Sequence, residues 1–352
     1  MKFLKGYTKQ EVSWMMYDWA NSAHSVIIVT LLPIFFDTVA SYTADSVSSM
    51  STWGYATSIA MAIVAIAAPF LGVFGDIRGM RKKLFTVFLF IGVAACAGLA
   101  FTPGMDFMSS TAAAGRVATL ILVLYIISVI GFDASAIYYD AFLTDITTEE
   151  RMDRVSTLGY GLGYIGGSTI PLLIFLIMNL VGVPMLTCLA VIFAITAVWW
   201  LVFSIPLLKN CQQTSGKPYE KGDVGRNIRG VGTTAKEIIA NKTMLVYILA
   251  YFFYIDGVHT VISMATTYGA NLGLDSTGMM LALLLVQILG LPFCLVYMKL
   301  SEKFGARAMV GFGICVYMFI CIFAYFMNSL WQFCAQPARA VFRHSPVRCS
   351  AS

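Results

Sequence analysis

Long apolar runs separated by short polar turns constrain this chain more than any other feature of its sequence. About twenty apolar positions lie on each side of a turn at 72–83, which is enough to cross a hydrocarbon core of about 30 Å at about 1.5 Å per residue. The chain is 59% hydrophobic and only 12% charged, whereas a soluble domain carries roughly 25% charged residues. We therefore predict an all-α, polytopic membrane protein.

The apolar runs predict about nine spans, with ends placed to within about 2 to 4 residues. The predicted spans cover 14–38, 54–76, 84–103, 117–146, 155–181, 185–207, 244–271, 277–300 and 308–327. A long polar segment follows the sixth of them, and we interpret it as a linker with a short interfacial helix near 234–239. The predicted domains are a six-helix bundle over 1–207, a cytoplasmic linker over 208–243 and an incomplete second bundle over 244–335.

The last stretch, 336–352, does not continue this pattern. Three Arg and two Pro fall between Pro337 and Arg348, and such a segment cannot cross a bilayer. We expect an atypical tail, and a frameshift is our leading explanation for it.

Positive charges predict the orientation. Lys and Arg cluster before the first predicted span and after the second, fourth, sixth and eighth, whereas the opposite connections are almost free of them apart from Arg116. Loops rich in Lys and Arg stay on the cytoplasmic side, so we predict a cytoplasmic N-terminus and a location in a bacterial inner membrane. This topology accounts for the net charge of +5 without a nucleic-acid partner.

Ionisable side chains inside the spans are the main functional candidates, because charges are costly to bury in a membrane. Near mid-membrane lie His24 in the first predicted span, Asp133 in the fourth, and Asp256 with His259 in the seventh. These helices recur every third span, and one shared water-filled cavity would account for their charges. Asp256 and His259 are three residues apart, so they are neighbours on a helix surface. The alternative is that these groups only hold helices together.

Three further polar residues are candidates for the same pathway. Asp140 follows Asp133 by seven residues on the same helix face, where it could be a second step of a proton or cation path, a cap or a gate. Asp18 and Asn21 are three apart on the first span, where they bind substrate or brace a neighbouring helix; we favour bracing. Glycines at 159, 163 and 167 recur every four residues and indicate close helix packing.

Signatures of metalloproteases, phosphate-binding loops and nucleophile elbows are absent from the sequence. The cysteines inside the apolar runs show no metal-ligand spacing. We therefore predict a protein that is not an enzyme and that has no metal and no cofactor.

Three stretches of the chain resemble the vacuole-effluxer-like family of the major facilitator superfamily: Tyr17–Ser22, Gly72–Leu84 and Tyr139–Gly167. That family includes the autophagy-related vacuolar amino-acid exporter of fungi. The resemblance implies twelve helices in two six-helix bundles, of which about nine are present here, and alternating access by rocking of the bundles. It also implies a central cavity lined by helices one, four, seven and ten.

The turn between the second and third spans resembles the loop motif between helices two and three of the superfamily. We give it a gating role as a hypothesis; the alternative is that its cations only fix the orientation. Its motif carries over to Gly72, Asp76, Gly79 and Arg81 of this chain, whereas Ile77 and Met80 stand where the superfamily usually has basic residues. We expect Asp76 to pair with a cation or cap a helix in one access state and to release it in the other.

Together these observations predict a proton-coupled secondary transporter for a small polar metabolite, with amino-acid export as the best choice. Its partners would be that substrate, protons and the lipid bilayer. The alternative is a non-transporting membrane fragment or a partner-binding helix bundle that results from loss of the last three helices.

Overall fold

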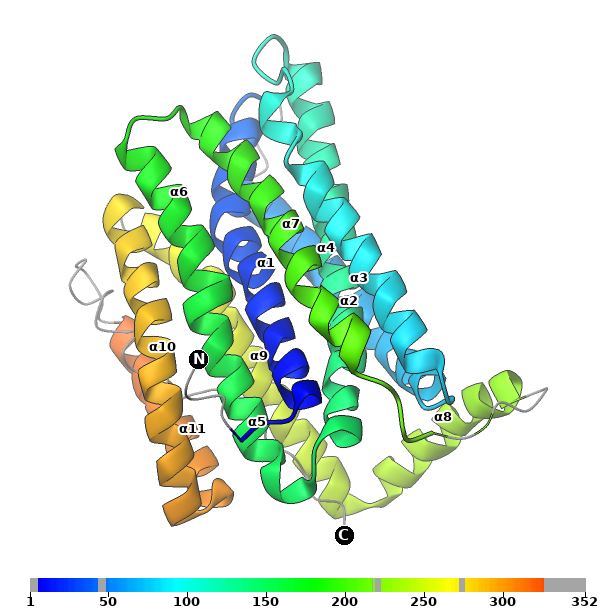
Figure 1. Ribbon diagram of the computed structural model, residues 1–352. Coiled ribbons are helices and arrows are strands. Elements are labelled where there is room, and N and C mark those ends of the chain that lie inside the picture. The colour runs from blue at the N-terminus through cyan, green and yellow to red at the C-terminus, as the bar shows by residue number, and fades with distance from the viewer. Residues whose placement is uncertain (1–5, 44–48, 217, 219–222, 272–275, 326–352) are drawn as a thin grey trace.

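The computed structural model describes the chain apart from residues 1–5, 44–48, 217, 219–222, 272–275 and 326–352. Every regular element of the described residues is a helix, and the long helices run side by side in one elongated bundle (Figure 1). In the first half the helices are α1 (Lys9–Ala40), α2 (Ser49–Gly75), α3 (Met80–Leu99), the short η2 (Thr102–Gly104), α4 (Thr111–Ile146), α5 (Glu149–Leu162), η3 (Gly163–Thr169), α6 (Ile170–Leu180) and α7 (Met185–Asn210).

The second half contributes four described helices: α8 (Asp223–Ala240), α9 (Lys242–Asn271), α10 (Ser276–Phe304) and α11 (Ala306–Tyr325). Across the described residues, six helices are long and apolar enough to cross a membrane, or up to eight if each of two bent pairs is one span. A helix occupies every predicted span, so the all-α, polytopic fold class is confirmed. The predicted atypical tail at 336–352 lies outside the described residues.

Local sequence signals explain where the helices begin and break. The backbone N–H of Glu11 donates to the Thr8 hydroxyl at 3.1 Å, and the Thr8 N–H donates to the Glu11 carboxylate at 2.7 Å. This reciprocal capping satisfies two amides at the start of α1. The fifth predicted span is one helix in three parts, because the glycine-rich η3 adopts a π-helix between α5 and α6.

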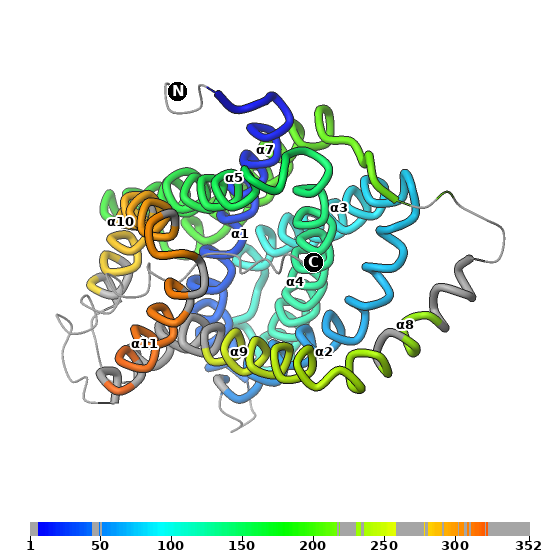
Figure 2. The backbone as a smooth tube through the Cα atoms, turned by 90° about the horizontal axis from the view of Figure 1, so that it is seen from below, coloured from blue at the N-terminus to red at the C-terminus, as the bar shows by residue number. Residues whose placement is uncertain are grey.

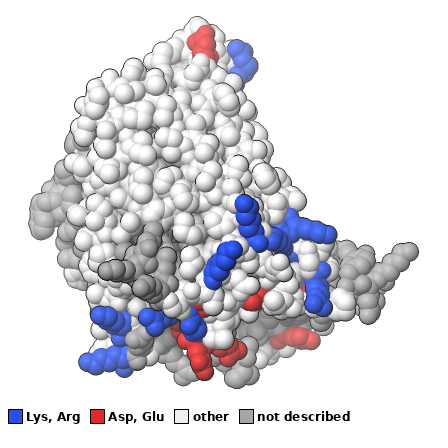
Figure 3. Space-filling view, in the orientation of Figure 1, with Lys and Arg blue, Asp and Glu red and all other residues white. Residues whose placement is uncertain are grey.

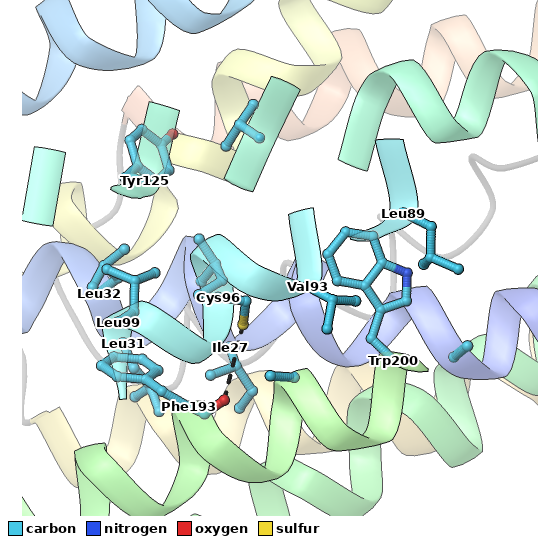
Figure 4. Packing of buried hydrophobic residues seen from close by; sticks show 14 of the residues in the cluster. Ile27, Leu31, Leu32, Leu89, Val93, Cys96, Leu99, Tyr125, Phe193 and Trp200 are labelled. Atoms are coloured by element: carbon cyan, nitrogen blue, oxygen red, sulfur yellow. Dashed lines mark hydrogen bonds between the residues drawn. The ribbon is translucent and has the colours of Figure 1, made fainter. Parts of the chain in front are cut away.

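Close packing of α1, α3, α4 and α7 forms the main core. Figure 4 shows Leu89, Val93 and Cys96 of α3 against Ile27 of α1 and Trp200 of α7, with the Cys96 thiol donating to the Phe193 carbonyl at 3.9 Å. The backbones of α3 and α4 are nearly in contact, since a Cβ on Gly131 would lie 2.5 Å from the Cα of Gly92. Small residues of this kind let membrane helices approach closely.

The second half packs on the first mainly through α10, which lies beside α5, η3 and α6 (Figures 1 and 2). Gly290 of α10 is in contact with Tyr164 of η3, because a Cβ there would lie 2.4 Å from the tyrosine ring. In the predicted linker at 208–243 the helix is longer than the short one expected near 234–239, because α8 covers Asp223–Ala240. Residues 230–240 of α8 turn by 99° into α9.

Candidate functional site

Most Lys and Arg side chains gather at one end of the molecule, the lower end in Figure 3. The start of α1, the α2–α3 turn, the α4–α5 turn and the end of α7 all lie there (Figure 1). We call this the basic end. The candidate residues fall into a group within the helices and a group in the α2–α3 turn at the basic end.

Asp18 and its neighbours on α1 pack against the glycines of α5 and η3. A Cβ on Gly159 would lie 2.7 Å from the Asp18 carboxylate, and one on Gly163 would lie 2.4 Å from the Ser22 hydroxyl. Asn21 on the same stretch is buried. The absence of side chains at these glycines lets the polar stretch of α1 lie directly on the fifth span, in keeping with the bracing role that we favoured for Asp18 and Asn21.

Aromatic residues fasten this stretch of α1 to α4. The Trp14 ring stacks on Tyr139 with ring centres 4.3 Å apart, and its Nε1–H donates to the Tyr139 carbonyl at 2.9 Å. The Tyr17 hydroxyl shares a hydrogen bond of 2.9 Å with the hydroxyl of Ser135. The Tyr139 side chain lies close to the carboxyl groups of Asp18 and Asp140. Tyr139 thus connects two of the predicted candidates, although the sequence assigned it no role.

His24 lies inside the first bundle, where it contacts α4 and α7. Its Nε2 shares a hydrogen bond of 2.5 Å with the Ser128 hydroxyl, and its ring lies 4.8 Å from the ring centres of both Phe132 and Trp200. Only 3% of His24 is exposed, and its Nδ1 has no hydrogen-bond partner among the described residues. His24 therefore packs against α4 and α7, and its predicted coupling role stays a prediction.

Asp133 and Asp140 of α4 differ in their surroundings. Asp133 is half-buried, and its Oδ2 is enclosed without a hydrogen-bond partner among the described residues. Asp140, nearer the basic end, is exposed and lies within electrostatic range of Tyr251 on α9. Asp133 is therefore the candidate whose carboxyl group is least satisfied by the protein itself.

The candidates of the seventh predicted span lie on α9. Asp256 is exposed in the structure, and the side chain of His259 lies outside the described part. Their helical spacing is as predicted, and their proposed pairing stays a prediction.

The α2–α3 turn contains the four predicted gating residues. Gly72 is in the last turn of α2 and accepts a backbone hydrogen bond of 3.1 Å from Asp76. Gly79 has a φ of +82°, the left-handed conformation that glycine adopts without strain, and it is the N-cap of α3. Arg81 is 5% exposed, and its guanidinium lies 3.7 Å from the Asp76 carboxylate. The predicted proximity of Asp76 and Arg81 is therefore present.

Asp145 is a partner of this turn that the sequence interpretation missed. Its carboxylate forms an ion pair with Arg81, which also donates to the Ala141 carbonyl at 3.0 Å and lies over the Phe142 ring at 5.9 Å. Its Oδ1 accepts from the backbone amides of Thr214 and Ser215 at 3.1 and 2.8 Å. A carboxylate at the last turn of an apolar run, opposite a basic turn, was the available signal.

Two hollows in the described part contain none of these candidates. One, of about 320 Å³, lies on the outer face of α7. The other, of about 190 Å³, lies between α1, α6 and α7 and is lined almost entirely by apolar residues. We therefore assign the candidate site from its polar residues and not from a cavity.

Comparisons with known proteins show what this chain is similar to. Residues 42–342 match the model of the family described as vacuole effluxer Atg22 like. An uncharacterized MFS-type transporter of Bacillus subtilis, YxiO, is 39% identical over 338 residues, which are 94% of this chain and 76% of the relative. Autophagy-related protein 22-1 of Penicillium rubens is 25% identical over 177 residues, which are 47% of this chain and 30% of that protein.

Solved structures of the major facilitator superfamily share the fold. The proton:xylose symporter XylE bound to 6-bromo-6-deoxy-D-glucose superposes with a TM-score of 0.65 at 13% identity, covering 95% of this chain and 79% of the symporter. A second D-xylose-proton symporter structure gives a TM-score of 0.58 at 16% identity, covering 96% of this chain and 80% of that one. At these identities the similarity shows the fold alone.

Proposed function

Because this chain belongs to the vacuole effluxer Atg22-like family and is an MFS-type transporter, we propose that it is a proton-coupled secondary transporter that exports a small polar metabolite. Our choice of substrate class is an amino acid. The proposed mechanism is alternating access, in which the bundle formed by 1–207 rocks against the one formed by 244–335. The basic end would face the cytoplasm, since its loops are rich in Lys and Arg.

The proposal depends mainly on the surroundings of Asp133. Its Oδ2 is enclosed within the helices and has no hydrogen-bond partner among the described residues. Carboxyl groups at such depth are costly unless they serve an ion or substrate path. In the proposed cycle Asp133 takes up a proton in one access state and releases it in the other. Asp140, on the same helix and nearer the basic end, would exchange that proton with water.

The names of the similar proteins support export and proton coupling. The family description contains the word effluxer, which supports export. XylE is a proton:xylose symporter, and this supports proton coupling on the same fold. Substrate recognition would involve Asp256 and His259 of α9, whereas Asp18 and Asn21 of α1 would brace the fifth span.

The test is transport by purified protein in liposomes with a pH-sensitive dye inside. Individual amino acids are added outside, and dye fluorescence reports proton movement coupled to each. We expect one or a few amino acids to produce a proton flux in the wild-type protein. Asp133→Asn should reduce that flux at least tenfold, because the amide cannot release a proton. Asp153→Asn is the matched control, since Asp153 is an exposed residue of α5.

Two outcomes would contradict this proposal. If counterflow of a labelled amino acid occurs and Asp133→Asn leaves proton flux unchanged, the role of Asp133 is wrong while transport stands. If no amino acid moves with either readout, amino-acid export is wrong, and the alternative of a non-transporting helix bundle is favoured.

A further inference from the structure

The six residues that follow α7, Cys211–Gly216, do not lead directly away from the first bundle. They run across the basic end and contact the α2–α3 turn and the last turn of α4. We call this segment the strap. Its sequence, rich in Gln, Thr and Ser, suggested only the beginning of a flexible linker.

Gln213 of the strap caps helix α3, although it lies more than 130 residues away along the chain. Its side-chain oxygen accepts from the backbone amides of Gly79 at 2.8 Å and Arg81 at 3.2 Å, and its side-chain nitrogen donates to the Gly75 carbonyl at 3.0 Å. The first amides of a helix have no partner within the helix, and the N-cap residue Gly79 has no side chain to supply one. Gln213 therefore replaces the missing cap and also holds the end of α2.

Asp145 at the end of α4 holds the next two residues of the strap. Besides the two backbone amides described above, its Oδ1 accepts from the Thr214 hydroxyl at 2.9 Å. The other carboxylate oxygen pairs with Arg81. One buried carboxylate thus joins three segments that are distant in sequence: α4, the start of α3 and the strap.

The two ends of the strap are also fixed. The Lys82 ammonium donates to the Cys211 carbonyl at 3.1 Å. Gly216 has a φ of +122°, and a Cβ there would lie 2.7 Å from the Asp76 carbonyl oxygen. Glycine is required at this position for two independent reasons, backbone conformation and close approach.

We propose that the strap is a clamp that holds the α2–α3 turn against the end of α4, with Gln213 as the residue that positions Gly79 and Arg81. The clamp also connects the turn mechanically to the second half of the chain. Gly216 is separated from the start of α8 at Asp223 by seven residue steps, which span at most about 25 Å. A separation of the start of α8 from Gly216 greater than that span pulls the strap from the turn and loosens the Arg81–Asp145 pair.

Hydrogen exchange measured by mass spectrometry tests the cap directly in the full-length protein. We expect the amides of Gly79 and Arg81 to be protected in the wild type and to exchange about five- to tenfold faster in Gln213→Ala, as loss of a typical hydrogen bond implies. Gln213→Glu keeps the acceptor oxygen and should preserve the protection. Gln212→Ala is the matched control, because Gln212 is the exposed neighbour.

Cys211 provides a second, independent readout. It is the fully buried first residue of the strap, and burial raises the pKa of its thiol to about 12. A buried, protonated thiol reacts slowly with maleimides because the thiolate is the nucleophile. Opening of the clamp in Gln213→Ala should therefore accelerate N-ethylmaleimide labelling of the Cys211 peptide several-fold, while Cys96, buried in the core, stays unlabelled.

The proposal is overturned if the Gly79 and Arg81 amides of the wild-type protein exchange as fast as an open loop, a result that needs no variant. It is also overturned if Gln213→Ala and Gln212→Ala give the same exchange and labelling rates. Neither readout requires a transported substrate, so this test and that of the transport proposal can fail separately.

Discussion

At the scale of single residues, contact distances determine which glycines have room for a side chain. Gly131 lies where α4 approaches α3 so closely that an added Cβ would meet the backbone of Gly92 at 2.5 Å. Backbone atoms cannot move aside as a flexible side chain can, so the strain would have to separate the two helices. Gly115 of the same helix has nothing within 4 Å of the equivalent position. The sequence cannot distinguish these two glycines.

We predict that Gly131→Ala lowers the thermal unfolding midpoint of the detergent-solubilised protein, corresponding to about 1 to 3 kcal/mol of overpacking. Gly115→Ala should leave the midpoint unchanged or raise it slightly, because alanine favours helix. Thermal denaturation followed by circular dichroism compares the two. Equal midpoints for both variants would contradict the packing described for α3 and α4.

Spacing along a helix predicts the depth of a side chain but not the direction in which it points. Sequence position placed His24 and Asp133 at similar depth, because depth follows from residue count. It did not determine the direction in which each side chain points. The structure turns His24 toward Ser128 and Trp200 inside the first bundle and leaves Oδ2 of Asp133 without a hydrogen-bond partner among the described residues.

At the scale of elements, the start of α1 is tied to the α4–α5 turn. Glu11 accepts from the Arg151 guanidinium at 2.9 and 3.0 Å and from the Thr147 hydroxyl at 2.7 Å, in addition to capping its own helix. Arg151 also lies over the Tyr7 ring at 5.5 Å. One buried carboxylate therefore serves the capping box and the contact between helices.

We predict that Glu11→Ala increases amide exchange in the first turn of α1 and at the α4–α5 turn together, by about fivefold, since both lose the same carboxylate. The effect stays moderate because the Arg151 side chain is 43% exposed and solvent screens the pair. Glu150→Ala, at an exposed position of α5, is the control. Faster exchange in α1 alone would show that the contact with Glu11 contributes nothing to the stability of the α4–α5 turn.

At the scale of the whole molecule, the distribution of charge determines the predicted orientation. The basic end contains the α2–α3 turn, whereas the turn between α3 and α4, with Met108, lies at the other end (Figures 1 and 3). Cationic loops resist translocation, so the two ends should face different compartments.

We predict that Met108→Cys reacts with a membrane-impermeant maleimide in intact bacterial cells and that Lys83→Cys reacts only after permeabilisation. Both positions are exposed in the structure, so accessibility to solvent does not separate them. Labelling is read at the level of the substituted peptide, which excludes the native cysteines. The reverse pattern would invert the orientation and reject the cytoplasmic assignment of the basic end.

The sequence by itself determined the class of fold and the place of the predicted spans along the chain, but not the full length of α8. Apolar runs must cover a hydrocarbon core of fixed thickness, so their lengths predicted every span, and the turn at Gly72–Lys83 was placed correctly between α2 and α3. The glycines at 159 and 163 predicted a close helix contact, and the structure shows it against Asp18 and Ser22. These are properties of local pattern, which the chain carries before it folds.

Only the tertiary structure determined which distant residues meet. Gln213 and Asp145 reach the α2–α3 turn from segments more than 60 residues away along the chain, and neither belongs to a local motif. Their contacts depend on the direction in which helices α4 and α7 end, which is set by packing of the whole bundle and not by hydrophobic period. For that reason the sequence identified Gly79 and Arg81 of the turn but could not identify the strap that caps it.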